Sequence, residues 1–547
     1  MSDVGPHTGG VRCTFGGECL ALGCASAMEE VGMRRLPIQL AVAAMLLVTM
    51  GPVTAHTLVT VTLEQVSGVS PFAAGCGLEP TGVDPIFGEG VVFVGSEVEP
   101  FVDINPANPA NLIAVWQQDR WSNGGSRGNA AGVSLNGGAT WQIVTFPDVT
   151  VCTGGEFDRA SDPWVSFGPD GIAYAMHLVT DGDTISGRPG GFGRNGMIVQ
   201  TSSDGGLSWN DPVLIAEDTE GDDLHDKNSV TADPTRPGFA YAVWDFLDLP
   251  TGAAINPDRG VFGGGLGFKG AALISRTTDG GQTWSKPKTL YNPGGVNQTI
   301  GNQIVVQPDG TLVDLFVEIL NFRNDDQDGQ FDLNLSLKRS PDAGETWLPH
   351  GRPIRFGEMA FAPISDPDTG QSHRTADIIP DFAVDSDVGT LYAVWQDARF
   401  TGVSQVAFTM SSDGGFTWTT PIRISQTPAD AANPLNAQAF IPAVHVADDG
   451  TVGVTYYDFR TNTGGGGTDT DLWLAHCGTG CGADPNNWEE NHVAGPFDSR
   501  QAPIARGFFL GDYVGLTSDG DDFLSVATLT GGDGPTDEWF ARIAPTP

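Results

Sequence analysis

Short runs of apolar and β-branched residues, separated by turn residues, recur along most of the chain. Met197 to Thr201 and Pro212 to Ile215 are two such runs on either side of one turn, and runs of this kind are typical of strands. Glycine and proline supply 74 and 37 of the 547 residues, so breaks between the runs are frequent. The pattern predicts an all-β protein built from antiparallel hairpins.

One turn sequence occurs five times, at a spacing of about 70 residues. The five segments are Ser134 to Trp141, Ser202 to Trp209, Thr277 to Trp284, Ser340 to Trp347 and Ser411 to Trp418. They share the pattern Ser-x-Asp-Gly-Gly-x-Thr-Trp, which the last segment fits at every position and the others fit with one replacement each. Asp-Gly-Gly between two strand-like runs predicts a hairpin turn, because glycine accepts a positive φ and the carboxylate accepts backbone N–H groups. The tryptophan is expected to cover the turn.

A second hairpin alternates with the first. It consists of a short strand, a turn rich in proline, glycine and aspartate, and a longer strand. It occurs seven times: Pro100 to Gln117, Asp162 to His177, Lys227 to Asp245, Gly301 to Glu318, Pro380 to Asp397, Phe440 to Asp458 and Asp512 to Thr528. Two hairpins per repeat make a four-stranded antiparallel sheet, the blade of a β-propeller. We predict seven blades, with six as the alternative, and a strand near Val91 to Val94 that completes the last blade.

The N-terminal region has the order of a secretion signal. Arg34 and Arg35 precede an apolar run from Leu36 to Met50, and small residues follow up to Ala55, as in a cleaved export signal. We therefore expect residues 1–32 to be an upstream extension, 33–55 the signal, 56–90 an N-terminal segment and 91–547 the propeller. The protein is predicted to be secreted, and no later run is long enough to span a membrane.

The cysteines of the expected mature chain agree with export. They are Cys76, Cys152, Cys477 and Cys481, an even number that suits disulfides in an oxidising compartment. Four cysteines allow three pairings, and proximity in sequence favours Cys477 with Cys481 and therefore Cys76 with Cys152. A zinc site is the rival interpretation, but no Cys-x-x-Cys pair supports it.

The charge balance excludes some partners. The chain has 27 Lys and Arg against 67 Asp and Glu, a formal net charge of -40. A surface this acidic repels phosphate, so nucleic acid is excluded as a partner. A hydrophobic content of 40% is too high for a disordered acidic chain.

The repeated turn resembles the Asp box, or BNR repeat, of the sialidase superfamily, and the resemblance extends from about Glu97 to the C-terminus. It implies a β-propeller fold and an exo-α-sialidase-like activity on extracellular glycans. In that superfamily the box is a structural turn far from the active site, so it indicates the fold more strongly than the chemistry.

If the boxes join the third and fourth strands of each blade, the ends of second strands and the starts of first strands share the opposite face. This face is expected to carry the axial pocket, ringed by Glu99, Asp162, Asp226, Lys227, Asn302, Asp381 and Tyr513. Arginines suit an acidic sugar because a guanidinium grips a carboxylate with two hydrogen bonds. The candidate substrate-binding arginines are Arg120, Arg323, Arg399, Arg460 and Arg506.

Each of these arginines also has a structural interpretation. Asp-Arg and Asp-x-Arg sequences, as at Arg399 and Arg460, are equally typical of salt bridges that tie strands together. Aromatic residues recur at equivalent places in the second strands and are expected to be core rather than sugar-stacking platforms: Trp116, Trp244, Trp395 and Tyr456.

The resemblance implies a tyrosine nucleophile activated by a glutamate, with an aspartate as acid and base. The segment from Tyr513 to Leu516 resembles the family's nucleophile setting, and Glu318 is the candidate partner. The early arginine signature is missing, since that stretch reads Glu97-Val-Glu-Pro-Phe101, and so is the usual acid.

Other residues are candidates for the missing groups. Asp119 or Asp162 would replace the acid, and Arg159, Arg374 and Arg506 could replace the arginine.

No cofactor is required by this chemistry, although one acidic segment resembles part of a calcium site. Asn324, Asp326 and Asp328 alternate like the first half of an EF-hand loop, but Leu335 stands where the bidentate glutamate is needed. A solvated acidic loop is the alternative.

Two functions are compatible with these features. The first is a monomeric, secreted, sialidase-like glycoside hydrolase. The alternative is a non-catalytic Asp-box propeller that binds a glycan or a protein through the same face.

Overall fold

Each of the five repeated turns joins two antiparallel strands, as predicted, and the same side-chain contacts close all five. In the second, Ser202 donates its hydroxyl proton to Asp204 at 2.8 Å, and the Gly206 N–H donates to the Ser202 hydroxyl at 2.9 Å. Equivalent contacts occur in the other four segments, where Asn136 takes the place of the aspartate in the first. The Thr417 hydroxyl and N–H lower the pKa of Asp413 to about 2, so the charged carboxylate organises this turn.

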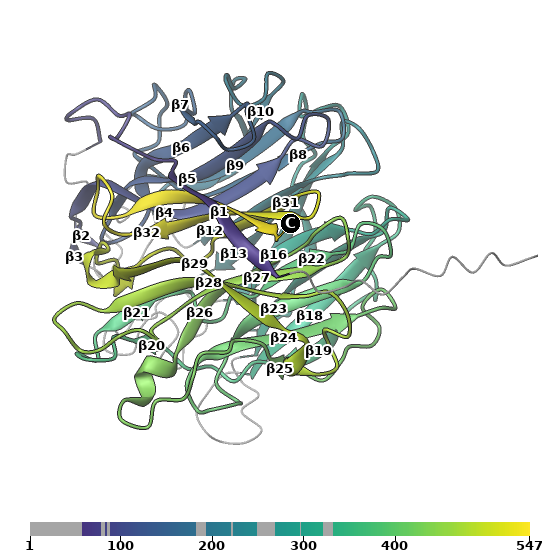
Figure 1. Ribbon diagram of the computed structural model, residues 1–547. Helices are drawn as coiled ribbons and strands as arrows, with labels where there is room; N and C mark the ends of the chain where they lie inside the picture. The colour runs from purple at the N-terminus through teal and green to yellow at the C-terminus, as the bar shows by residue number, and fades with distance from the viewer. Residues whose placement is uncertain are drawn as a thin grey trace, which may run out of the picture. The chain divides into compact units, whose positions relative to one another are not determined.

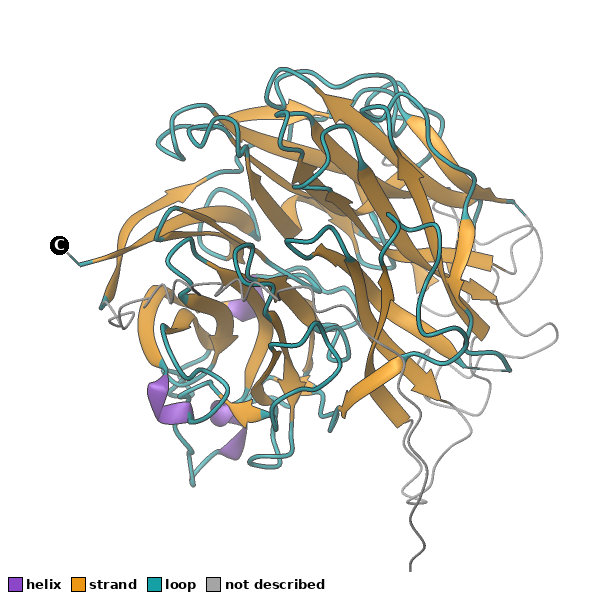
Figure 2. Cartoon of the chain, turned by 90° about the vertical axis from the view of Figure 1, so that its right-hand side faces the viewer, coloured by secondary structure: helices purple, strands orange, loops and turns teal. Residues whose placement is uncertain are grey.

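The computed structural model describes residues 57–77, 83–84, 88–181, 193–219, 223–248, 269–295, 297–320 and 332–546. Strands dominate these residues, and the short 3-10 helices are η2 (Pro434–Ala437), η3 (Pro485–Asn487) and η4 (Ser499–Gln501) (Figure 2). None of the helices in these ranges is long and apolar enough to cross a membrane.

Seven four-stranded antiparallel units follow one another along the described chain (Figure 1). The first four are β4 (Val92–Ile104), β5 (Leu112–Trp121), β6 (Ser126–Ser134) and β7 (Gln142–Thr145); β8 (Arg159–Phe167), β9 (Ala173–Thr180), β10 (Asn195–Ser202) and β11 (Val213–Asp218); β12 (Asp223–Ala232), β13 (Ala240–Asp248), β14 (Lys269–Thr277) and β15 (Lys288–Tyr291); and β16 (Gln298–Val306), β17 (Leu312–Leu320), β18 (Asp332–Ser340) and β19 (Ile354–Glu358). A single pairing of Ser126 with Ala160 connects the first unit to the second.

The remaining three units are β22 (Asp381–Val384), β23 (Leu391–Asp397), β24 (Gln405–Ser411) and β25 (Ile422–Arg423); β26 (Ala439–Val446), β27 (Val452–Asp458), β28 (Asp469–Cys477) and β29 (Glu489–Asp498); and β31 (Gly515–Asp519), β32 (Asp522–Leu529), β33 (Asp537–Pro545) and β1 (Leu58–Gln65). The first strands of the units contact one another in the order β4, β8, β12, β16, β22, β26, β31 and back to β4. A closed cycle of four-stranded antiparallel sheets is a β-propeller.

The last unit is completed by the start of the described chain. β1 pairs with β33 from Leu58↔Pro545 to Gln65↔Trp539, and Figure 1 shows this purple strand among yellow ones. The prediction that Val91 to Val94 closes the ring is wrong, because Val92 pairs with Trp121 as part of the long strand β4. Part of the expected N-terminal segment therefore belongs to the propeller.

The four repeated aromatic residues are core, as predicted. Trp116, Trp244, Trp395 and Tyr456 are all fully buried. Trp116, for example, packs with Leu524, Val526 and Phe540 of the last unit. These side chains fill the space between neighbouring sheets, where large apolar surfaces stabilise the fold most.

Both favoured disulfides, Cys76–Cys152 and Cys477–Cys481, are present. The second closes the connection between β28 and β29, and the Trp488 indole donates to the Cys481 carbonyl at 3.0 Å. In the fifth repeated turn the Trp418 indole donates to the Gly415 carbonyl at 3.1 Å. The sixth unit thus has a disulfide-closed turn, covered by a tryptophan, where the preceding five have an Asp box.

In the part of the chain that the structure describes, two smaller sheets lie outside the seven units. β2 (Val83–Asp84) pairs with β3 (Gly88–Glu89). β20 (Ile364–Ser365) pairs with β21 (Ser372–Arg374), which runs parallel to β30 (Phe508–Phe509). The second sheet joins the connection before β22 to the connection before β31.

Candidate functional site

Five of the first strands are interrupted by a bulge at a similar place. The pairing shifts there in β4, β8, β12, β16 and β26. The bulged residues have positive φ: Glu99 57°, Asp162 45°, Lys227 46°, Gly301 71° and Ile441 50°. A left-handed conformation costs about 1 kcal/mol or more for residues other than glycine, and such strain concentrates at functional sites.

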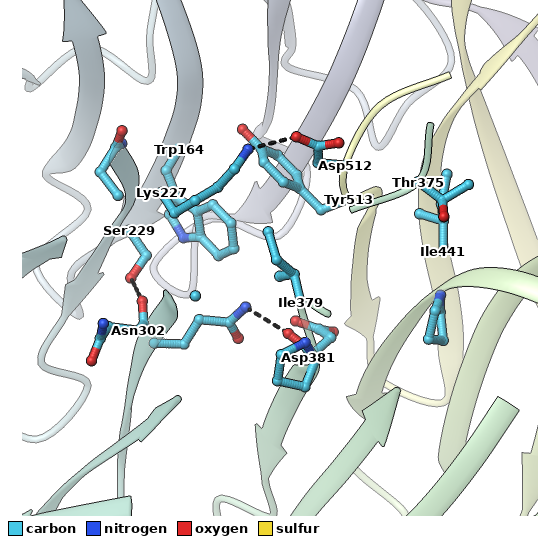
Figure 3. A pocket seen from close by; sticks show the side chains of 15 residues that line it. Trp164, Lys227, Ser229, Asn302, Thr375, Ile379, Asp381, Ile441, Asp512 and Tyr513 are labelled. Atoms are coloured by element: carbon cyan, nitrogen blue, oxygen red, sulfur yellow. Dashed lines mark hydrogen bonds and ion pairs between the residues drawn. The ribbon is translucent and has the colours of Figure 1, made fainter. Parts of the chain in front are cut away.

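An axial pocket opens between these strands (Figure 3). Its lining includes Lys227, Asp381, Ile441 and Asp512. A second cavity continues it, since both are lined by Trp164, Ser229, Gln303 and Asp381. Of the residues predicted to ring the pocket, Lys227, Asn302, Asp381 and Tyr513 do so.

Lys227 is the centre of a buried charged cluster. Its Nζ lies 2.6 Å from Asp512 Oδ2, 3.1 Å from Asp162 Oδ2 and 3.8 Å from Glu99 Oε1. Arg374 Nη2 contacts the same Asp512 oxygen at 2.6 Å. The Lys227 side chain is 10% exposed and Asp512 is 1% exposed, so these charges interact with little screening by water.

Three arginines gather beside this cluster. Arg120 and Arg374 lie over the ring of Phe509 at 4.9 and 4.3 Å. Arg506 is exposed, yet the surrounding protein and the charge of Arg374 lower its pKa to about 9. Burial and the same Arg374 charge lower the pKa of Arg120 to about 10. Several guanidinium groups side by side can bind an anion, because each can donate two hydrogen bonds to a carboxylate.

The mini-sheet of β20, β21 and β30 carries Arg374, and its strand β30 follows Arg506, whereas Arg120 lies in β5. β21 ends at Arg374, and β30 contains Phe509. Arg500 holds this region in place through contacts with Asp366 at 2.6 and 2.9 Å.

Glu99 and Asp512 are neighbours whose protonation is driven in opposite directions. Burial, with the charges of Asp162 and Asp512, raises the pKa of Glu99 well above its ordinary value. The pKa of Asp512 is lowered despite burial, because Arg374 and Lys227 favour its charged form. A carboxyl pair with separated pKa values is a usual source of acid and base groups.

Of the four predicted catalytic residues, the structure brings Tyr513 and Asp162 to this cluster. The Tyr513 hydroxyl donates to the Pro163 carbonyl at 3.2 Å. Burial and the nearby carboxylates of Glu99 and Asp162 raise the pKa of Tyr513 well above its ordinary value, which opposes formation of a phenolate nucleophile.

The other two predicted catalytic residues make contacts elsewhere. Glu318 accepts hydrogen bonds from Tyr291 at 2.5 Å and Arg355 at 2.6 Å. Asp119 forms a buried ion pair with Arg127 at 2.6 Å, and Arg127 Nε also donates to the Cys76 carbonyl. Asp119 thus anchors the N-terminal segment to the first unit.

The predicted substrate-binding arginines also divide into two groups. Arg120 and Arg506 join the arginine cluster described above. Arg399 pairs with Asp397 at 2.8 Å, and Arg460 pairs with Asp458 and Glu490, as in the structural interpretation. Arg323 and the calcium candidates Asn324, Asp326 and Asp328 lie outside the described residues.

The described ranges hold no group of three or more His, Cys, Asp or Glu residues that could bind a metal ion.

Sequence reasoning missed the roles of Asp512 and Lys227 in the site. Asp512 directly precedes the predicted pocket residue Tyr513, and Lys227 is predicted at the pocket without a role. An acidic residue before proline, as in Glu99-Pro100 and Asp162-Pro163, is a further sequence feature of this region. These dipeptides mark two of the bulged positions.

No family model matches this sequence, and no curated protein matches it either. Solved structures with a similar fold include the Hadza microbial sialidase Hz136, at 16% identity and a TM-score of 0.43 over 81% of this chain and 75% of that chain. The Penicillium chrysogenum alpha-L-arabinanase has 12% identity and a TM-score of 0.42 over 89% of this chain and 98% of that chain. A Dyadobacter fermentans protein of unknown function has 15% identity and a TM-score of 0.41 over 71% of this chain and 95% of that chain.

Sialidases are thus among the structural neighbours of this propeller, as the Asp-box resemblance implies. At such low identities and TM-scores the likeness supports no functional argument. Function has to be argued from the residues of the site.

Proposed function

We propose that the protein is a secreted glycoside hydrolase of sialidase-like fold that acts on acidic extracellular glycans at the axial pocket. The observation that carries the proposal is the carboxyl pair of Glu99 and Asp512 beside three arginines. The pair supplies acid and base groups, and the arginines supply a binding site for an anionic sugar. Two disulfides suit the extracellular location.

In this proposal the Glu99–Asp512 pair holds one proton, and Asp512 is the member that lines the pocket. Glu99 is 1% exposed, so its proton passes by way of Asp512 to the glycosidic oxygen, as the bond between that oxygen and the anomeric carbon breaks. Water then adds to the anomeric carbon and returns a proton to the pair. Proton transfer by a positioned group contributes about 100-fold to 10,000-fold to such a rate.

The arginines determine the class of substrate. Arg506 is exposed, and Arg374 is 16% exposed, so an anionic group on the sugar can reach both. An exo-α-sialidase is the specific activity that this arrangement favours, because its substrate carries a carboxylate on the sugar that is released.

A non-catalytic glycan-binding propeller is the second candidate. The observation in its favour is that Glu99 and Asp512 are each 1% exposed and already contact Lys227 or Arg374. Carboxylates already paired with cations can have a structural role in the ring of sheets and take no part in catalysis.

The test is an assay of the purified mature chain on a fluorogenic sialoside and on a panel of other glycosides, arabinosides included. Asp512→Asn and Glu99→Gln are expected to lower kcat at least 100-fold. Lys288→Ala is the matched control, since Lys288 is 59% exposed and pairs only with Glu345 in the described contacts. No turnover on any glycoside, together with binding on a glycan array, would select the binding propeller.

A further inference from the structure

We propose that Lys227 is a positioning residue of this site, which holds Asp512 as the carboxylate of the Glu99–Asp512 pair and leaves the proton on Glu99. The inference rests on the proposed function for its catalytic meaning. The placement of the proton can be measured without any substrate.

The first argument is geometric. Lys227 Nζ contacts Asp512 Oδ2 at 2.6 Å, but it lies 3.8 Å from Glu99 Oε1. Only the shorter distance allows a hydrogen bond. Of two neighbouring carboxyls, the one that receives the ammonium hydrogen bond is the one that ionises.

The second argument concerns Glu99. Its Oε2 accepts a hydrogen bond from the Gln117 amide, which in turn accepts one from Arg120 at 2.6 Å. Its Oε1 is buried and has no hydrogen-bond partner among the described residues. Asp512 Oδ1 is likewise buried without a partner in the described part of the chain, so the two carboxyls differ in the cations at 2.6 Å, which contact Asp512 Oδ2 and not Glu99.

The third argument is the backbone of Lys227, which is held at a φ of 46° in the bulge of β12. The bulge places its side chain in the pocket beside Asp512 (Figure 3). A strained conformation in a lysine persists only where the surrounding structure fixes it.

Other charged groups face Asp512 from the elements around it. They are Glu99 of β4, Arg120 of β5, Asp162 of β8, Asp226 and Lys227 of β12, Arg374 of β21, Asp377, and Arg506. Arg374 and Lys227 are the two cations in direct contact with Asp512. Removal of the Lys227 ammonium therefore leaves Arg374 as the one direct cationic contact among the described residues.

The experiment is a pH titration of the full mature chain labelled with 13C at the aspartate carboxyl carbons, with Asp512→Asn to assign the signal. Lys227→Met is expected to raise the titration midpoint of Asp512 by at least one pH unit, about a tenfold change in proton affinity. Lys227→Arg, which keeps the charge, is expected to restore the low midpoint. Lys338→Met is the control, because Lys338 is also buried but lies near Asp314 instead.

The same variants are then assayed for the acidic limb of the kcat/KM profile on any glycoside that is turned over. A limb that moves to higher pH in Lys227→Met and returns in Lys227→Arg supports the inference. An unchanged Asp512 midpoint in Lys227→Met would overturn it, even if the enzyme is active. A shifted midpoint in a chain that hydrolyses nothing would support the inference and count against the proposed hydrolase.

If Lys227→Met does not fold, Lys227→Gln replaces it, because the amide keeps a hydrogen-bond donor without the charge. The titration midpoint of Asp512 in Lys227→Gln has to rise as well.

Discussion

Arg460 forms an ion pair with Asp458, two residues before it, through an Nε to Oδ2 contact of 2.5 Å. Asp458 is fully buried, and Arg460 reaches on to Glu490 at 2.8 Å. The pair lies within the sixth unit, between the end of β27 and β29. It connects strands of one sheet and makes none of the contacts that define the axial cluster.

Replacement of Arg460 by alanine is therefore expected to affect stability rather than ligand binding. It leaves a buried carboxylate without its cation, which costs about 3 kcal/mol or more. Thermal unfolding of Arg460→Ala should show a melting temperature several degrees below that of the wild type. A weaker affinity for an acidic sugar with an unchanged melting temperature would contradict this assignment.

Arg506→Ala is expected to give the opposite result. The exposed Arg506 side chain belongs to the arginine cluster, and loss of one charge-assisted hydrogen bond weakens an anionic ligand by about tenfold or more. Calorimetric titration with a sialic acid measures this change, and thermal unfolding serves as the control. The idea fails if Arg506→Ala binds the sugar as tightly as the wild type.

The buried carboxyl of Glu97 is expected to make the free energy of unfolding fall as the pH rises. Burial and the charges of Asp537 and Asp119 raise the pKa of Glu97 to about 8, from an ordinary value of 4.5. The folded state thus binds a proton more tightly than the unfolded state, so this contribution is fully present below pH 4.5 and is lost as the pH rises through 8. Glu97→Gln keeps an acceptor for the Gln118 amide and removes the ionisation.

The free energy of unfolding of Glu97→Gln should accordingly exceed that of the wild type by a margin that grows from about pH 5 to about pH 8 and then levels off at a few kcal/mol. Urea unfolding at several pH values measures the difference. Glu345→Gln is the control, because Glu345 lies on the surface beside Lys288. Parallel curves for the wild type and Glu97→Gln would rule out a buried, protonated Glu97.

The two disulfides are expected to stabilise the fold unequally. Cys76–Cys152 spans a sequence separation of 76, and Cys477–Cys481 a separation of 4. In the chain-entropy model these loops correspond to about 4 and about 2 kcal/mol. Unfolding of the two double serine variants under the same conditions tests the order, and equal losses would show that loop length does not determine it.

The repeated hairpins could be predicted because their information is local. Asp204 and Gly206 define a turn within eight residues, and their residue types identify this turn in the sequence. The alternation of two hairpins then implies the four-stranded sheet. The same reasoning correctly placed Lys227 and Tyr513 at the pocket, because strand order fixes which ends share a face.

Arg374 and Arg506 were candidates from the sequence, but their place in the site could not be derived from the repeats, because they lie in irregular connections. Arg374 and Arg506 precede β22 and β31 through the mini-sheet, which follows no repeat. Glu318 ends a second strand, as expected, but Tyr291 and Arg355 engage it. The repeats do not show which connections carry residues to the axial pocket, because that depends on long-range packing rather than on periodicity.

The pairing of β1 with β33 determines when the protein can finish folding. The Glu538 N–H donates to the Ser67 hydroxyl across a sequence separation of 471, and contacts between such distant residues form late and at a high entropic cost. During synthesis the ring stays open until the ribosome has released the final strand. If the chain is exported, it would cross the membrane before β1 pairs with β33. Until then the unpaired edge of β33 would need protection from aggregation.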